Sequence, residues 1–178
     1  MTDTRDKLNE ARYFLLCMRN CSESNTFRYN LTAFLSAARS ITQIMQKEFA
    51  GVLAFHKWYS EKQDEMRKHD IMKYLHEQRR LSYHVRPVRT QSHVSLNLID
   101  HIMVTDSIKI VLSGTGEVKV TEANQKSQQI PASSATIELK YYFEDFAEKD
   151  VISICEEDLL ELEKLVVDCE KLKTDEPG

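Results

Sequence analysis

The stretch FRYNLTAFLSAARSITQIMQKEF, residues 27–49, carries the strongest helical pattern in this chain. Its apolar side chains recur at the spacing of a helix, and the small residues among them allow neighbouring helices to approach closely. We predict a helix that is capped by Asn25 or Thr26 and that buries a broad apolar face against other helices. That face is formed by Leu31, Phe34, Leu35, Ala38, Ile41 and Met45.

The segments on both sides of this stretch extend the helical pattern. Residues 4–20 repeat apolar side chains at helical spacing and are followed by a polar break, so they predict a preceding helix. Residues 52–84, which follow Gly51, predict a third helix whose aromatic start packs on the first two helices. Pro87 marks the point before which this third helix must end.

The pattern changes to that of strands after Gln91. β-Branched residues and alternating apolar residues predict strands over 92–104, 107–113, 117–121 and 136–143. Gly114-Thr115-Gly116 predicts a hairpin turn between the second strand and the third. The polar residues 123–134 predict a loop.

The last predicted element is an amphipathic helix over residues 149–173, with one strongly acidic face. Its apolar stripe needs helices to pack on, so we expect it to pack against the first three. The predicted fold class is mainly α (α+β): an up-and-down bundle of about four helices with a small antiparallel β insertion before the last helix. We expect a single domain, residues 1–178, with 91–146 as the β-rich insertion and 147–173 as the closing helix. The stripe is formed by Ile152, Cys155, Leu159, Leu162, Val166, Cys169 and Leu172.

Length and composition exclude several classes of protein. With 178 residues, of which 42% are hydrophobic, the chain can form one buried core but not two full domains. It has no apolar run long enough to span a membrane and no secretion signal, so we predict a cytoplasmic protein without a membrane partner. Cys17 and Cys21 lie one helical turn apart, but no second pair of ligands follows at a suitable spacing. We therefore predict no metal site and no cofactor.

The formal net charge of −4 hides two halves of opposite sign. Residues 1–90 contain 16 Lys and Arg against 10 Asp and Glu, a balance of +6, and residues 91–178 contain 8 against 18, a balance of −10. This asymmetry indicates an anionic partner for the first half. The alternative is that the acidic second half is itself the partner, within one chain or across a dimer.

Residues 67–89 hold the strongest candidates for chemistry, because seven Lys and Arg residues and three histidines gather there. An arginine and a histidine together supply a cation for a phosphate and a group for proton transfer. On an ideal helix Arg79 lies about 140° from His84, so the two meet only if the helix bends or if two copies of the chain bring their helix ends together. The alternative is a solvated basic face, with His84 favourably placed at the negative end of the helix dipole.

Several segments resemble the HEPN superfamily of helical bundle proteins. The motif Arg79-Arg80-Leu81-Ser82-Tyr83-His84 carries the functional part of this resemblance. HEPN proteins are similar in being dimeric helical bundles, and many are metal-independent endoribonucleases whose hallmark is an arginine followed, after a short spacer, by a histidine. The other matching segments are residues 8–14, 27–49, 58–59, 141–146, 150–152 and the closing helix.

This resemblance implies roles for the residues of the motif. A ribose 2′-hydroxyl would attack the adjacent phosphate and give a cyclic phosphate without a metal ion. In that reaction His84 exchanges the proton and Arg79 stabilises the charged transition state, so these two are the expected catalytic residues. The side chains expected to hold the RNA backbone or to stack on a base are Lys73, His76, Arg80 and Tyr83.

Two functions follow as expectations. The first is a HEPN-like homodimer that binds RNA or a nucleotide at its paired helix ends, with endoribonuclease activity as a further property. The second is a catalytically silent helical bundle that acts as a protein-interaction or structural module and docks an acidic protein partner. Arg80 favours the second, because active HEPN members commonly have a small polar residue after the arginine.

Overall fold

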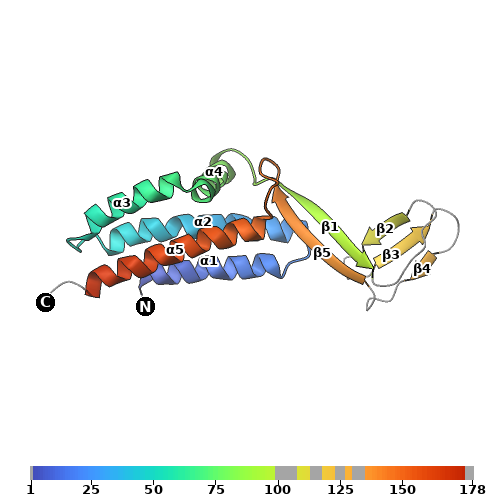
Figure 1. Ribbon diagram of the computed structural model, residues 1–178, viewed down its shortest axis with the longest axis horizontal. Helices are drawn as coiled ribbons and strands as arrows, with labels where there is room; N and C mark the ends of the chain where they lie inside the picture. Colours follow the sequence, from blue (N-terminus) through green and yellow to red (C-terminus); the bar gives the residue numbers. More distant parts are fainter. Residues whose placement is uncertain (1, 99–107, 113–117, 123–126, 130–134, 175–178) are drawn as a thin grey trace. The chain divides into compact units, whose positions relative to one another are not determined.

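The computed structural model describes residues 2–98, 108–112, 118–122, 127–129 and 135–174, and these residues are mainly helical (Figure 1). The chain forms two compact units, of which the first consists of Met1–Gln91 and Tyr142–Gly178 and the second of Ser92–Tyr141. The predicted fold class is confirmed, since a helical bundle carries a small antiparallel β insertion before its last helix.

Helices α1 (Asp3–Arg19) and α2 (Ser24–Glu48) are joined by a short polar loop. The hydroxyl of Thr2 caps α1 by accepting a hydrogen bond from the Arg5 backbone N–H at 3.1 Å. The cap of α2 is Glu23 rather than Asn25 or Thr26, so that detail of the prediction was wrong. The Glu23 carboxylate accepts from both of those backbone N–H groups, and its charge is favourable at the positive end of the helix dipole.

The core of the helical unit forms on α2. All six residues of the predicted apolar face are buried, which confirms the prediction for this helix. Phe27 and Phe49 extend the buried face towards both ends, and Ala37 and Thr42 widen it. A face this wide cannot be covered by one neighbouring helix, so several helices must pack around α2.

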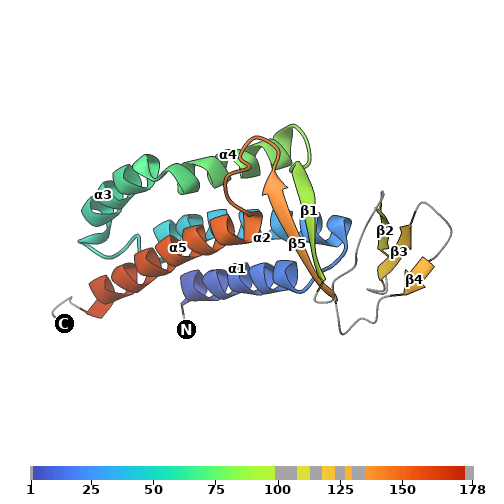
Figure 2. The ribbon, with the colours of Figure 1, turned by 45° about the vertical axis from the view of Figure 1, so that its right-hand side comes forward.

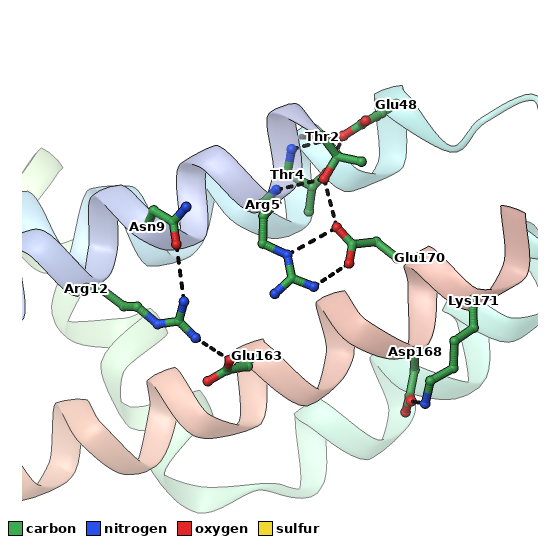
Figure 3. Close-up of polar contacts among 10 residues, drawn as sticks. All are labelled: Thr2, Thr4, Arg5, Asn9, Arg12, Glu48, Glu163, Asp168, Glu170 and Lys171. Carbon is green, nitrogen blue, oxygen red and sulfur yellow. Dashed lines mark hydrogen bonds and ion pairs between the residues drawn. The ribbon is translucent and has the colours of Figure 1, made fainter. Parts of the chain in front are cut away.

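Helix α5 (Val151–Thr174) lies alongside α1 and α2 in both views of the chain (Figure 1, Figure 2). Most of the predicted stripe of this helix is buried, whereas Ile152 and Leu172 at its two ends are only half-buried. Three ion pairs join α1 to α5, and their members are seven residues apart on each helix (Figure 3 draws two of them). We call this series the heptad ladder; its rungs are Arg5–Glu170, Arg12–Glu163 and Arg19–Glu156.

The first turn of α1 is tied to the last turn of α2 by partly buried polar contacts. Thr4 is fully buried, and the Glu48 carboxylate accepts hydrogen bonds from its backbone N–H at 2.9 Å and from its hydroxyl at 2.7 Å (Figure 3). The Lys173 ammonium lies 3.8 Å from the other oxygen of the same carboxylate. Glu48 therefore links α1, α2 and α5 at one end of the bundle.

The predicted third helix is in fact two helices, α3 (Phe55–Lys68) and α4 (Asp70–His84). The break lies at His69, whose backbone is extended with φ −83° and ψ 109°. Arg67 and Lys68 end α3 and Asp70 begins α4, which places each charge favourably for the dipole of its own helix. Helix α4 packs on α2 and α5, and α3 packs on α5, both on the side away from α1 (Figure 1, Figure 2). The Gln46 amide of α2 donates a hydrogen bond to the Tyr59 hydroxyl of α3 at 3.1 Å.

Helix α4 is held in place by residues at the end of the β insertion. The Asp145 carboxylate accepts hydrogen bonds from the Tyr74 hydroxyl at 2.5 Å and from the Gln78 amide at 3.3 Å. Burial and this hydrogen bond raise the pKa of Tyr74 far above its usual value, so the phenol stays protonated and donates. The Tyr74 ring also contacts Phe143, with ring centroids 5.2 Å apart.

The insertion leaves and re-enters the helical unit at adjacent backbone positions. The Glu144 backbone N–H donates to the Arg89 carbonyl at 3.4 Å, and the two side chains form an ion pair at 3.7 Å. Strands β1 (Thr90–Leu98) and β5 (Ala135–Phe143), which begin and end the insertion, pair with each other.

A second sheet has the order β2-β3-β4 and is formed by Ile108–Leu112, Val118–Glu122 and Ser127–Gln129. Strands β2 and β3 pair antiparallel with Ile110 opposite Val120, which confirms the predicted hairpin. The predicted turn at Gly114-Thr115-Gly116 lies outside the described residues. Strand β4 falls within residues 123–134, which were predicted as a loop, so the prediction missed one strand.

The polar contact between Thr4 and Glu48 gives a test of the bundle. We expect Thr4→Val to lower the free energy of unfolding by about 1–3 kcal/mol, because the half-buried Glu48 carboxylate loses one hydrogen-bond partner while the shape of the side chain at position 4 is kept. Chemical denaturation followed by circular dichroism measures this change. Thr32→Val is the matched control, since the Thr32 hydroxyl donates only to the Arg28 carbonyl of its own helix. Equal destabilisation by both variants would contradict a special role of the Glu48 contact.

Candidate functional site

A cleft of about 620 Å³ opens in the helical unit and is lined by residues of α2, α3, α4 and α5. This volume lies within the range of sites for small molecules. The lining residues differ in burial, and we call the buried ones the floor and the half-buried or exposed ones the rim. The floor consists of Leu35, Ala38, Thr42, Tyr59, Leu75, Asp158 and Leu162. The rim consists of Arg39, Gln63, Met66, Arg67, Met72, Lys73, His76 and Arg79.

The rim is positively charged. Arg39, Arg67, Lys73 and Arg79 carry full charges, and no lining residue of the rim is acidic. Arg67 forms an ion pair with Asp64 at 2.9 Å. Arg39, Lys73 and Arg79 form no ion pair with any residue that the structure describes. Their charge is therefore available to an anion that enters the cleft.

Arg79 is the cation of the rim that is most constrained. Its guanidinium lies over the Tyr83 ring, 4.9 Å from the ring centroid, which fixes the side chain by a cation–π contact. The Nε–H of Arg79 is buried and has no hydrogen-bond partner in the described part of the chain. A buried donor without an acceptor is costly, and it marks a position where a ligand atom would be stabilising.

The other basic groups of the rim are close enough to influence one another. The Arg39 guanidinium donates to the Thr42 hydroxyl at 3.1 Å, which turns it towards the floor of the cleft. Burial lowers the pKa of His76, and the positive charges of Arg39 and Arg79 lower it further. The lowered pKa favours the neutral form of His76 at neutral pH.

The floor contains one carboxyl group, that of Asp158, which is only 5% exposed. Burial raises the pKa of this carboxyl to about 7, and none of the rim cations contributes to the shift. Asp158 makes neither a hydrogen bond nor an ion pair with the residues that the structure describes. A buried carboxylate is normally paired, so this one is an acceptor without a partner inside the cleft.

The structure brings three of the predicted site residues to this cleft, because Lys73, His76 and Arg79 all line its rim. Arg80 points elsewhere and forms a two-pronged contact with Glu77, with distances of 2.8 Å and 2.6 Å.

The remaining predicted residues, Tyr83 and His84, are exposed at the end of α4, where their rings touch edge to face at 5.5 Å. Neither residue lines the cleft, and Tyr83 contacts both Arg79 and His84. The catalytic roles of Arg79 and His84 stay predictions.

Sequence reasoning missed Arg39 and Asp158, which come from α2 and α5. Both had a signal. Arg39 interrupts the apolar stretch of α2. Asp158 lies three residues after Cys155 and four before Leu162, so it occupies a position on the apolar stripe where a carboxylate is out of place. An ionisable residue on an otherwise buried stripe is a candidate for a site.

The described residues contain no group of three or more His, Cys, Asp or Glu side chains that could hold a metal ion. Likewise, no helix in the described ranges is both long enough and apolar enough to cross a membrane.

The comparisons with known proteins correct the resemblance to HEPN proteins. The family model of bacteriophage lambda protein ea47 matches residues 2–136, which include α1 to α4 and most of the insertion. No curated protein and no solved structure matches the chain. The HEPN assignment was therefore wrong, and the reason is that its functional motif is short enough to occur by chance on a basic helix. The chain belongs to the family of bacteriophage lambda protein ea47.

Proposed function

We propose that this protein binds a small anionic ligand of nucleotide size in the cleft between α2, α3, α4 and α5. The observation that carries the proposal is the set of rim cations Arg39, Lys73 and Arg79, which line a cleft of about 620 Å³. None of these cations has an ion-pair partner in the described part of the chain, whereas Arg67 is paired with Asp64. A surface that gathers unpaired positive charge at a concave site attracts anions and binds them there.

The lining of the cleft suits a ligand that has an apolar or aromatic body as well as a charged group. Leu35, Leu75 and Leu162 line the floor, and the flexible side chains of Met66 and Met72 stand at the rim. Methionine adapts its shape to flat or irregular partners. A free inorganic anion would leave this apolar surface uncovered, whereas a nucleotide would cover it with its base.

The type of cation favours a phosphate as the charged group. Two of the three unpaired cations are arginines, and the planar guanidinium binds phosphate oxygens with two parallel hydrogen bonds. The unpartnered Nε–H of Arg79 is one such donor. The sequence predicted the basic face of α4 as a site for RNA or a nucleotide, and the cleft volume of about 620 Å³ suits a single nucleotide.

The cleavage of RNA by Arg79 and His84 stays a prediction, and the geometry gives it less support than binding, because only Arg79 lines the cleft. A homodimer, an acidic protein partner and a cytoplasmic location also stay predictions.

Incubation of a mixed-sequence single-stranded RNA in EDTA with the wild type, Arg79→Ala and His84→Ala tests the nuclease activity. The cleavage hypothesis requires that the wild type cuts and that both variants fail; an uncut RNA contradicts it and leaves binding as the function.

The neighbouring residues Arg79 and Arg80 allow a matched test of the binding site. We expect Arg79→Gln to weaken the binding of nucleoside monophosphates by at least about tenfold, because a buried charge-assisted hydrogen bond is lost. Arg80→Gln is the control with the same change one position along α4, and it should leave the affinity nearly unchanged, since Arg80 pairs with Glu77 outside the cleft. Isothermal titration calorimetry measures both affinities, and circular dichroism checks the fold.

A second control varies the ligand. A nucleoside without its phosphate should bind more weakly than the monophosphate to the wild type, and Arg79→Gln should reduce that difference. The absence of any binding by the wild type, or equal losses in Arg79→Gln and Arg80→Gln, would overturn the proposed function.

A further inference from the structure

The unpaired carboxylate of Asp158 limits which ligand the cleft can accept. It lies on the floor among buried side chains and is 5% exposed, but its oxygens are not sealed from solvent, so water that enters the cleft can reach them until a ligand displaces it. A ligand that reaches the floor must therefore replace the lost hydrogen bonds of this carboxylate or leave it unpaired in the complex. The part of the ligand that lies deepest must carry hydrogen-bond donors.

The charges of the cleft are separated by depth. The acceptor, Asp158, lies on the floor, whereas Lys73 and His76 are exposed at the rim and Arg79 is half-buried. A ligand that satisfies both ends has donors at its buried end and an anionic group at its outer end. A nucleoside monophosphate inserted base first has this polarity, with the phosphate among the cations.

We propose that the cleft holds a guanine nucleotide, with the Watson–Crick edge of the base on the Asp158 carboxylate and the phosphate on Arg39, Lys73 and Arg79. This inference rests on the proposed function and adds the identity of the base. The guanine edge offers two adjacent donors, N1–H and the 2-amino group, and these match the two oxygens of a carboxylate.

The other common bases match the carboxylate less well. Adenine and cytosine present one amino group beside a ring nitrogen that is an acceptor, and this acceptor repels an ionised carboxylate. Uracil presents a single N–H between two carbonyl oxygens. A site whose buried polar group is paired by one ligand and left unpaired by another discriminates strongly between the two.

We expect the bound base to determine whether Asp158 is ionised. Its pKa near 7 means that the empty cleft holds a mixture of acid and carboxylate at neutral pH, and guanine binds the carboxylate. On the same helix Cys155 is buried next to it, and the pKa of that thiol is raised well above its usual value by burial and by Asp158. The charged or titratable groups that line the cleft from the other helices are Arg39 on α2, Tyr59 and Arg67 on α3, and Lys73, His76 and Arg79 on α4.

The experiment compares GMP, IMP, AMP and UMP by isothermal titration calorimetry at pH 8 with the wild type, Asp158→Asn and Asp168→Asn. The wild type should prefer GMP to each other nucleotide by at least about tenfold. IMP lacks only the 2-amino group, so its weaker binding would locate the contact on the guanine edge. Asp158→Asn should lose the preference. Asp168→Asn removes a carboxylate from the same helix, one that pairs with Lys171, and should keep it.

The pH dependence of the wild type tests the same contact without a mutation. At pH 6 most Asp158 is protonated, so the affinity ratio of GMP to AMP should fall by about tenfold between pH 8 and pH 6. Titration of the phosphate and of His76 changes the affinities for GMP and AMP by the same factor, so it cancels in their ratio. A ratio that does not change with pH would contradict the inference even if the Asp158→Asn variant were poorly folded.

Stability measurements provide the control for the Asp158→Asn variant. The pKa of Asp158 is raised by folding from 3.8 to about 7, so between these values the folded chain binds a proton that the unfolded chain releases. Wild-type stability should therefore fall as the pH rises through this window, and Asp158→Asn should melt at a higher temperature than the wild type at pH 8.

The outcomes separate the two proposals. Equal binding of all four nucleotides, or a GMP preference that survives in Asp158→Asn, would overturn the assignment of guanine and leave the anionic-ligand cleft in place. No binding of any nucleotide by the wild type would overturn both. A GMP preference that is lost only in Asp158→Asn and falls at low pH supports both.

Discussion

The packing around α2 is the constraint on which the rest of the helical unit depends. The buried face of this helix is so wide that α1 and α5 cover only part of it, and α4 packs on another part. Helices α3, α4 and α5 leave a gap over part of α2, and there Leu35, Ala38 and Thr42 form part of the floor of the cleft. The candidate site is therefore a consequence of how a wide apolar helix is surrounded by separate neighbours, rather than an addition to a finished core.

The heptad ladder has a different role from the apolar core. Its ion pairs are partly exposed, and pairs of this kind contribute little to the free energy of unfolding. Their common spacing, however, matches the repeat with which two packed helices present the same side to each other. The Thr2 hydroxyl donates to Glu170, the partner of Arg5, and this hydrogen bond adds to the register of α1 against α5 at the start of the series.

The predictions from sequence were best where one periodic pattern determined one helix. The apolar face of α2 and most of the α5 stripe were predicted residue by residue, because burial on a helix repeats at its own spacing. The break at His69 was missed because it contains neither proline nor glycine. Its signal was the sequence Arg67-Lys68-His69-Asp70, in which basic residues end one helix and an acidic residue begins the next.

The candidate site was predictable only in part, for a related reason. Lys73, His76 and Arg79 lie on a single helix, so their common face could be derived from spacing alone. Arg39 and Asp158 join them only through the packing of α2 and α5 against α4, which no local pattern encodes. The HEPN assignment failed for the opposite reason, since it gave weight to one short motif while the family relationship is spread over residues 2–136.

The adjacent exit and entry of the β insertion at Arg89 and Glu144 have a consequence for the history of this family. Because the helical unit is closed by its own contacts at that junction, a change in the length of residues 92–141 adds no strain to α4 or α5. The two units are thus free to diverge at different rates. The inserted strands can be lengthened, shortened or exchanged without loss of the helical fold that carries them.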